Sequence, residues 1–287
     1  MKAHPKVVLT IGGSDSGGGA GVQADIKTFS VLGLHGTSAI TAITAQNTLG
    51  VDRVFGLSAE TVHAQLRSIL CDFQISSAKT GMLFSSETVI AVAEHVRDCR
   101  LPLVIDPVIE AEAGGRLLKP EALRALIDHL MPLSRVITPN IFEAEAISGI
   151  PVTDSASAEK AARRITDLGA EAVIIKGGHL DCTDLLLEEG EVQLLKGVRA
   201  SGGNHGVGCT YSAALASYLA MGCSLKEAAV RAKAFAAAAI KWSMDVGKGV
   251  SPVNQAGRII DEARRYRDLC SGTLCDDDRS GPGRSDD

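Results

Sequence analysis

The sequence predicts an α/β protein in which helices cover both faces of a mostly parallel β-sheet. Short β-branched apolar runs alternate along the chain with longer segments whose apolar residues recur at helical spacing. The strand runs are continuously apolar, which is typical of strands buried on both faces. No linker divides the chain before its end, so residues 1–267 are predicted to form a single domain.

Each predicted strand is a short apolar run, and several end at a residue that disfavours continuation. The run 7–11 stops at two glycines, and the runs 103–106 and 135–138 each stop at a proline. The last two runs flank Glu189-Gly190, which is typical of a tight hairpin turn. In chain order the predicted strands are 7–11, 38–45, 77–82, 103–106, 135–138, 172–176, 184–187 and 191–195.

The predicted helices lie between these runs, and capping residues mark some of their ends. Ser157 is the expected N-cap of the helix 158–168, and Gly149 ends a shorter helix before it. In the segment 201–220 a glycine-rich loop leads into a helix whose apolar periodicity begins at Thr210. The predicted helices are 24–32, 59–70, 86–97, 120–130, 142–148, 158–168, the helix from 210, and 224–242.

Composition excludes several classes of function. The 287 residues are 45% hydrophobic, enough for a substantial core, whereas an aromatic content of 3% and a net charge of −5 argue against nucleic-acid binding. The first residues contain no long apolar segment, so neither a signal peptide nor a membrane span is predicted. The seven cysteines show no CxxC spacing and indicate neither zinc nor disulfides. We expect a reduced, cytoplasmic protein with an acidic, disordered tail over residues 268–287.

The junction of the glycine-rich loop with its helix is the first candidate site. Gly206, Val207 and Gly208 precede Cys209 there, and free N–H groups at a helix start favour an anion. A thiol at a helix N-terminus is also expected to have a lowered pKa. The alternative is a glycine-rich turn that ends in a small buried cysteine.

Other candidates follow predicted strands, where ligands bind in open α/β sheets. Asp106 suits a metal ion, although a turn aspartate is equally consistent with its position. Asn140 and Glu143 suit a nucleotide and its metal, but a helix capping box would explain both. Lys176 stands beside glycines and suits a phosphate, unless its aliphatic part only covers apolar surface.

Three further residues are weaker candidates. The Gln46 amide offers a donor and an acceptor to a flat heterocycle, with loop capping as the alternative. Asp25 lies in the first turn of a predicted helix, where a carboxylate also stabilises the helix dipole. Lys248 lies between two glycines in a predicted turn and is a possible second anion contact.

Two nucleotide-binding motifs are excluded. The chain contains no GxxxxGK[ST] P-loop. Residues 19–24 match the GxGxxA variant of the dinucleotide fingerprint, but residues 34–45 hold no acidic side chain for a ribose. A nicotinamide cofactor is therefore not expected.

Eight motifs in order resemble the hydroxymethylpyrimidine/phosphomethylpyrimidine kinases of thiamine synthesis, which belong to the ribokinase-like superfamily. The motifs are GGSDSGGGAGVQADIKTF, TAQNTLGV, KTGML, IDPV, ITPN-x-x-E, IKGGH, HGVGCT and VGKGVSPV. The resemblance spans residues 7–266 and implies a single-domain, three-layer α/β/α fold with a mostly parallel central sheet. It also implies two ATP-dependent steps, in which 4-amino-5-hydroxymethyl-2-methylpyrimidine is phosphorylated first and its monophosphate second.

The resemblance assigns roles to the candidate residues. Gln46 would read the aminopyrimidine edge, surrounded by Gly13, Asp25, Met82 and Val108, with Lys248 at the pyrimidine or phosphate end. ATP would contact Asn140, Glu143 and Lys176, and Mg²⁺ would contact Asp106 and Glu143. The N–H groups of Gly206, Val207 and Gly208 would form an anion hole, with Cys209 as the base. A monovalent cation and a homodimer are further expectations.

Two alternatives stay open. Asn204 stands where the family usually has threonine, and asparagine also occurs there in related pyridoxal kinases. Those kinases lack the AQNT segment, which this chain has at residues 45–48. A non-catalytic pyrimidine-binding regulator is the alternative from another class, although Cys209, Asp106 and Lys176 are all intact. Val207 replaces a threonine of the family motif and removes only a hydroxyl.

Overall fold

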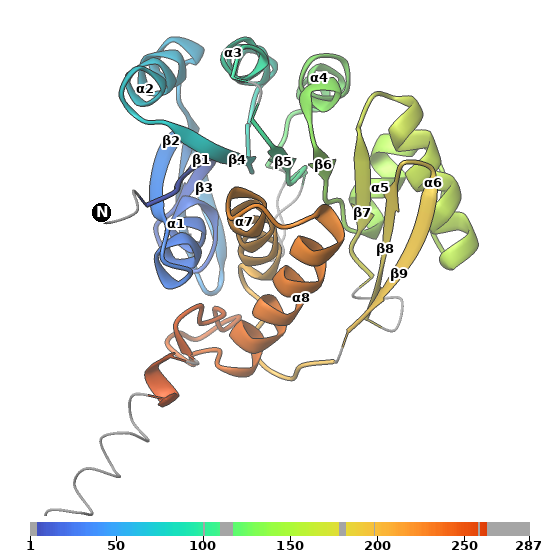
Figure 1. Ribbon diagram of the computed structural model, residues 1–287. Coiled ribbons are helices and arrows are strands. Elements are labelled where there is room, and N and C mark those ends of the chain that lie inside the picture. Colours follow the sequence, from blue (N-terminus) through green and yellow to red (C-terminus); the bar gives the residue numbers. More distant parts are fainter. Residues whose placement is uncertain are drawn as a thin grey trace, which may run out of the picture.

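A nine-stranded sheet runs through the centre of the molecule (Figure 1). The structure is a computed structural model that describes residues 5–99, 101–109, 117–177, 182–197, 199–257 and 259–262. The predicted tail, 268–287, lies outside the described residues. The strands are β1 (Val7–Asp15), β2 (His35–Asn47), β3 (Gly50–Gly56), β4 (Ile75–Thr80), β5 (Leu103–Ile105), β6 (Val136–Ile137), β7 (Ala172–Ile175), β8 (Thr183–Glu188) and β9 (Glu191–Lys196).

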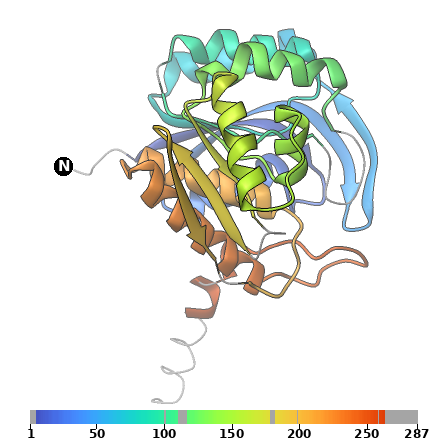
Figure 2. The same ribbon diagram turned by 90° about the vertical axis from the view of Figure 1, so that its right-hand side faces the viewer.

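The strand order is β3-β2-β1-β4-β5-β6-β7-β8-β9. The six strands from β2 to β7 in this order pair in parallel. Antiparallel partners close both ends, with β3 beside β2 and the β8–β9 hairpin beside β7. In the turned view of Figure 2, the β8–β9 hairpin lies towards the viewer and the β2–β3 pair lies at the distant end.

Helices cover both faces of the sheet. They are α1 (Gly21–Val31), α2 (Ala59–Asp72), α3 (Ser86–Arg97), α4 (Pro120–Ala125), α5 (Ile141–Ser148), α6 (Ser155–Asp167), α7 (Val207–Ala220) and α8 (Leu225–Lys241). Buried residues of α2 to α6 form a core on one face, and those of α1, α7 and α8 form a core on the other. Figure 1 shows α2, α3 and α4 above the sheet and α1, α7 and α8 below it. The predicted three-layer α/β/α fold is confirmed.

The continuous apolar strands explain this layering, because successive side chains of a strand point to opposite faces. In β5, Leu103 and Ile105 enter the first core while Val104 enters the second. An alternating polar strand would leave one of these cores incomplete. None of the helices in the described residues is long and apolar enough to cross a membrane.

Several element ends differ from the sequence prediction by a few residues, and the predicted helix 120–130 continues beyond α4 as a π-helix, Leu126–Leu130. Three further differences are more informative. Strand β3 was not predicted, since most of its residues are exposed and it carries no apolar run. Asp154, rather than Ser157, is the N-cap of α6; Ser157 takes the reciprocal position of that capping box. Helix α7 begins at Val207, three residues before the apolar periodicity starts. This last difference places Gly208 and Cys209 inside the first turn of the helix.

Candidate active site

A cleft of about 1320 Å³ opens along the carboxyl ends of the parallel strands. Its walls come from the ends of β1 and β2, from the loops after β4 to β7, and from the start of α7. The structure brings together in this cleft nearly every residue that the sequence singled out: Gly13, Asp25, Gln46, Met82, Asp106, Val108, Asn140, Glu143, Lys176, Gly206, Val207, Gly208 and Cys209.

Lys248 does not line the cleft. It is exposed in a turn that packs on the end of β2, where the Gly249 N–H donates to Thr48 Oγ1 at 3.1 Å. The Val250 N–H donates to the carbonyl oxygen of Thr48 at 2.8 Å. The assignment of Lys248 to the pyrimidine or phosphate end therefore lacks support, and the turn explains its position.

An ion pair lies in the centre of the cleft. Lys176 Nζ, after β7, is 2.9 Å from Asp106 Oδ1, after β5, and the Ser212 hydroxyl donates to Asp106 Oδ2 at 3.0 Å. Burial alone would raise the pKa of Asp106 and lower that of Lys176. Their mutual attraction outweighs it, so the pKa of Asp106 is lowered and that of Lys176 is raised. Both groups are charged at neutral pH.

Asn140 and Glu143 form the capping box that was the alternative to a ligand role. The Glu143 N–H donates to Asn140 Oδ1 at 2.9 Å, and the Asn140 N–H donates to Glu143 Oε2 at 2.8 Å. Burial raises the pKa of Glu143 to about 7, since it outweighs the attraction of Lys176. The capping box holds Glu143 beside the ion pair. With this pKa, the carboxyl group ionises near neutral pH.

The carboxylates of this region fit Mg²⁺ bound together with a nucleotide. Mg²⁺ in such sites uses one or two carboxylates plus substrate phosphates and keeps several waters. Asp106 and Glu143 supply two carboxylates close enough to influence each other's ionisation. The described residues contain no group of three or more His, Cys, Asp or Glu side chains that could hold a metal ion. The donor set fits a metal completed by phosphate oxygens.

The start of α7 faces the same ion pair. A methyl group added to Gly208 would lie 3.5 Å from Lys176 Nζ and 3.9 Å from Asp106 Oδ2. Gly208 and Cys209 are the second and third residues of the helix, whose N–H groups have no carbonyl partner within it. The Val207 N–H donates to the Asn204 carbonyl oxygen at 3.1 Å. Val207 belongs to the predicted anion hole, but its N–H already donates to another protein group.

The expected lowering of the Cys209 pKa is wrong. Cys209 is half-buried, and the protein packed around its thiol raises the pKa to about 12. Lys79 and a backbone hydrogen bond from Gly21 act in the opposite direction, but they do not outweigh burial. Nearby Asp25 and Asp106 disfavour a thiolate further. At neutral pH the Cys209 side chain is a neutral thiol.

A second ion pair, not predicted from the sequence, lies in the wall of the cleft and is almost fully buried. Lys79 Nζ on β4 is 2.9 and 2.8 Å from the two carboxylate oxygens of Asp25, and the Thr10 hydroxyl donates to Asp25 Oδ2 at 2.6 Å. Burial would lower the pKa of Lys79, but Asp25 raises it above its ordinary value. The available signal was a lysine inside an otherwise small, uncharged strand. The Asp25 carboxylate is thus occupied by protein groups.

The predicted pyrimidine end combines an apolar wall with polar groups. A methyl group added to Gly13 would lie 2.9 Å from Met82 Sδ, so glycine allows Met82 to pack against β1. Val108 lies on the same wall, two residues beyond Asp106, and its N–H donates to the Asp106 carbonyl oxygen at 2.9 Å. Flat apolar contact of this kind suits a ring, while the polar groups set its orientation.

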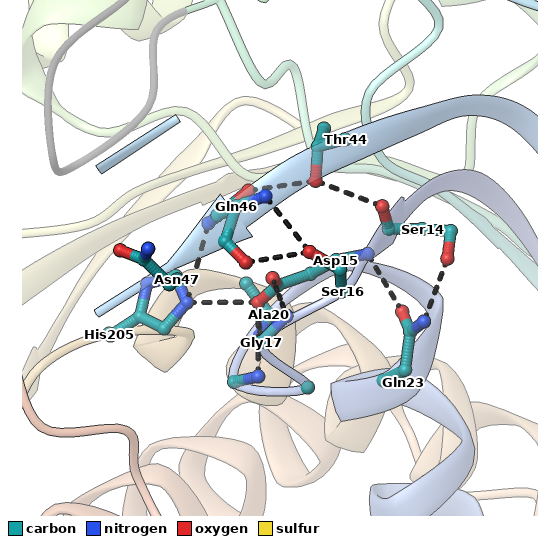
Figure 3. A network of polar contacts seen from close by, with 12 residues as sticks. Ser14, Asp15, Ser16, Gly17, Ala20, Gln23, Thr44, Gln46, Asn47 and His205 are labelled. Atoms are coloured by element: carbon teal, nitrogen blue, oxygen red, sulfur yellow. Dashed lines mark hydrogen bonds and ion pairs between the residues drawn. The ribbon is translucent and has the colours of Figure 1, made fainter. Parts of the chain in front are cut away.

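Gln46 belongs to a polar network that was not predicted from the sequence (Figure 3). His205 Nε2 lies 3.0 Å from Asp15 Oδ2 and 3.4 Å from Gln46 Nε2. Asp15 also accepts hydrogen bonds from the N–H groups of Gly17, Gly19 and Ala20, at 2.8, 3.0 and 2.8 Å. The network joins the first glycine loop to the residue just before the α7 N-cap.

The other end of the cleft carries a third ion pair that was not predicted. Lys233 Nζ of α8 is 2.6 Å from Asp184 Oδ1 of β8, which also accepts from the Gly177 N–H at 2.9 Å. Tyr211 lines the same end, and burial raises its pKa well above the ordinary value. Asp184, itself held by Lys233, thereby fixes the backbone directly after Lys176.

Taken together, the fold and the cleft define a class of protein. A lysine, two carboxylates and the N-terminus of a helix converge at the carboxyl ends of parallel strands, which is the arrangement of an α/β phosphotransferase acting on small molecules. The family model described as phosphomethylpyrimidine kinase matches residues 15–254. The chain therefore belongs to the phosphomethylpyrimidine kinase family, as the motifs predicted.

The names of similar proteins are consistent with this family. The chain is 48% identical over 261 residues to the hydroxymethylpyrimidine/phosphomethylpyrimidine kinase of Haemophilus influenzae, covering 88% of this chain and 97% of the relative. It is 44% identical to the thiamine biosynthesis bifunctional protein ThiED of Geobacter sulfurreducens, covering 86% of this chain but only 51% of that longer protein.

Two solved structures are similar to this one. The pyridoxal kinase of Staphylococcus aureus in complex with pyridoxal is 38% identical, with a TM-score of 0.82, covering 90% of this chain and 96% of that one. The phosphomethylpyrimidine kinase of Clostridium difficile is 41% identical, with a TM-score of 0.72, covering 80% and 97%. The fold is common to both kinds of kinase.

Proposed function

We propose that this protein is an ATP-dependent kinase of thiamine synthesis that phosphorylates 4-amino-5-hydroxymethyl-2-methylpyrimidine and then its monophosphate. The observation that carries the proposal is the Lys176–Asp106 pair beside the start of α7, in a chain of the phosphomethylpyrimidine kinase family. ATP use follows from kinase activity, and a solved relative, the pyridoxal kinase of Staphylococcus aureus, is in complex with ADP.

The chemistry asks mainly for alignment and charge stabilisation, because phosphoryl transfer needs little covalent help from a protein. Lys176 and the N–H groups of Gly208 and Cys209 would neutralise the transferred phosphoryl group from two sides. Asp106 orients Lys176, and Asp106 with Glu143 would hold Mg²⁺. When bound, that ion supplies positive charge to the nucleotide phosphates.

Cys209 needs a different role from the one expected of a thiolate. A neutral thiol is not basic enough to remove the proton of the acceptor hydroxyl before the phosphoryl group is transferred. In a loose transition state that proton leaves late and passes to an oxygen of the transferred phosphoryl group or to solvent, so a hydrogen bond that holds the hydroxyl in line is sufficient. A neutral thiol also avoids the repulsion that a carboxylate would exert on the monophosphate in the second step. We propose Cys209 as this hydroxyl-holding group.

Mass spectrometry of the reaction products tests the proposal. With ATP, Mg²⁺ and the aminopyrimidine, we expect the monophosphate to appear first and the diphosphate to follow. Binding of the pyrimidine without any phosphorylated product would instead establish the non-catalytic regulator.

Pyridoxal kinase activity is the second candidate. It is favoured by the higher TM-score against the pyridoxal kinase, 0.82 compared with 0.72, and by Asn204 before the HGVGC motif. The same assay with pyridoxal separates the two, and faster turnover of pyridoxal would reverse the assignment. A homodimer and a cytoplasmic location stay predictions of the resemblance; light scattering would measure whether the mass is twice 29.9 kDa.

A further inference from the structure

His205 connects segments that lie far apart in the chain. It is 8% exposed and follows Asn204 at the entry to α7. Its N–H donates to the Ser251 carbonyl oxygen at 3.3 Å, and its own carbonyl oxygen accepts from the Val253 N–H at 3.1 Å. Its side chain then reaches Asp15 in the first glycine loop and Gln46 at the end of β2 (Figure 3).

Glycine is required where the first loop and the entry to α7 meet. A methyl group added to Gly19 would lie 2.2 Å from His205 Cδ2, and one added to Gly206 would lie 1.9 Å from the Gly19 carbonyl oxygen. Gly206 also has a φ of 84°, in the left-handed region. The imidazole is therefore enclosed by backbone and has little freedom to turn away from Asp15.

The hydrogen bonds of Asp15 determine which nitrogen of His205 carries a proton. Burial would raise the pKa of Asp15, but hydrogen bonds from His205, Ala20 and Gly17 lower it, so the carboxylate is ionised. An ionised carboxylate only accepts hydrogen bonds. His205 Nε2, 3.0 Å from Asp15 Oδ2, must therefore be a donor whether the ring is neutral or charged.

This proton fixes the orientation of the Gln46 amide. With Nε2 of Gln46 towards His205, two N–H donors would face each other at 3.4 Å. Thr44 Oγ1, with one hydrogen, would also face two acceptors, Gln46 Oε1 at 3.1 Å and the Ser14 carbonyl oxygen at 3.0 Å. Turning the amide by 180° ends the contact between two donors and leaves Thr44 with one acceptor, because Gln46 Nε2 then donates to Thr44 Oγ1. Gln46 Oε1 becomes the second, longer acceptor at 3.4 Å of the His205 N–H that Asp15 accepts at 3.0 Å.

We infer that Asp15, acting through His205, locks the Gln46 amide in this single orientation and makes His205 a positioning residue for recognition of the pyrimidine. The inference rests on the proposed function, in which Gln46 reads the ring. The amide keeps one N–H and one lone pair for the ligand. An aminopyrimidine edge offers an amino donor beside a ring-nitrogen acceptor, whereas a 4-oxo analogue presents the reverse pattern. A locked amide matches only the first.

Equilibrium binding tests the inference without requiring catalysis. Isothermal titration calorimetry would compare dissociation constants for the aminopyrimidine and its 4-oxo analogue in the wild type, His205→Leu and His205→Gln. Glutamine places an N–H at the same number of bonds from the backbone as His205 Nε2, and leucine places none. We expect His205→Leu to lose about tenfold of the preference for the amino compound, as one hydrogen bond is worth up to that factor. His205→Gln should restore most of it.

Gln255→Leu is the matched control. Gln255 is 7% exposed and donates to Thr210 Oγ1 at 2.9 Å, so it also holds the first turn of α7 but does not line the cleft. This variant should lower stability without changing the preference. A folded His205→Leu with the wild-type preference, or a wild type without a preference, would overturn the inference.

A measurement on the wild type covers the case in which His205→Leu does not fold. The ¹⁵N chemical shifts of the His205 ring report which nitrogen is protonated, and we expect a proton on Nε2; a neutral ring protonated only on Nδ1 would contradict the lock. Failure of the proposed function has a different signature. It would appear as pyrimidine binding with the preference intact but with no phosphorylated product.

Discussion

Two lysine–aspartate pairs lie at neighbouring strand ends, and they differ mainly in exposure. The N–O distances are nearly equal, 2.8 Å for Lys79–Asp25 and 2.9 Å for Lys176–Asp106. The side chains of the first pair are each 1% exposed, whereas those of Lys176 and Asp106 are 18% and 2% exposed. Both pairs border the cleft, but the side chains of the first, here called the sealed pair, are almost fully buried, whereas the second presents its lysine to the cleft.

This difference separates a structural role from a functional one. Removing one partner of a buried pair lowers the stability of the fold, because it leaves the other charge buried and unpaired. A lysine open to the cleft can contact a phosphate and still be oriented by its aspartate. Under the proposed function, the same two residue types would serve stability in one pair and catalysis in the other.

The largest effect on stability is expected from Lys79→Met. The substitution leaves Asp25 buried without its cation and should lower the free energy of unfolding by about 3–5 kcal/mol. Urea unfolding monitored by circular dichroism measures the change. The double variant Lys79→Met/Asp25→Leu removes both charges and should recover most of the loss. If the single and double variants were equally unstable, packing rather than the unpaired charge would be the cause.

Cys209 lies near the sealed pair, and its reactivity should report the burial. Because burial raises the pKa of the thiol to about 12, iodoacetamide at pH 8 should label Cys209 about 10²–10³-fold more slowly than the exposed Cys71. The rate should still rise with pH above pH 9, since the thiolate forms only as the pH nears 12. Peptide mapping measures both sites in one sample. Equal labelling of the two cysteines would restore the idea of an activated thiolate.

Glu143, beside the open pair, should make stability depend on pH when no nucleotide is bound. Its pKa is raised from about 4.5 to about 7, so its contribution is fully present below pH 4.5 and is lost as the pH rises through 7. Glu143→Gln stays neutral and can still cap α5. Its stability relative to the wild type should therefore increase by about 3 kcal/mol between pH 4.5 and pH 8. A difference that does not change with pH would show an ordinary pKa.

The smallest effect is expected from an exposed pair. Arg124 and Asp128 are 78% and 40% exposed, although Arg124 Nε is 2.7 Å from Asp128 Oδ2. Arg124→Ala should cost only about 0.3–0.5 kcal/mol, because solvent screens the charges. The same urea experiment applies. A loss as large as that of Lys79→Met would remove exposure as the explanation of the difference between the pairs.

Strand ends and cleft residues could be predicted from the sequence because parallel strands bring their carboxyl ends together. That rule sufficed to place Asp106, Asn140 and Lys176 near one another. It also gave the layers of the fold, since continuous apolar strands require cover on both faces. Strand β3 escaped this reasoning because it is exposed and has no apolar run.

The partners of the site residues were harder to predict, because they depend on contacts between distant segments. Asp15 and His205 are 190 positions apart, and nothing local in either loop indicates their hydrogen bond. Lys79 and Asp25 likewise meet only through the sheet and α1. The pKa of Cys209 depends on how much protein surrounds the thiol, which a helix start alone does not reveal. The local sequence pattern therefore identified the site residues, whereas their pKa values depend on tertiary packing.

The most direct test of the division between the two pairs is the phosphorylation rate of Lys176→Gln. Glutamine removes the charge that faces the cleft, while the Ser212 hydroxyl still donates to Asp106. Circular dichroism first establishes that the variant is folded at the assay temperature. We predict a kcat for the aminopyrimidine about 10²–10³-fold below that of the wild type, the loss expected when a transition-state contact is removed. A folded Lys176→Gln that phosphorylates the pyrimidine at the wild-type rate would contradict the account.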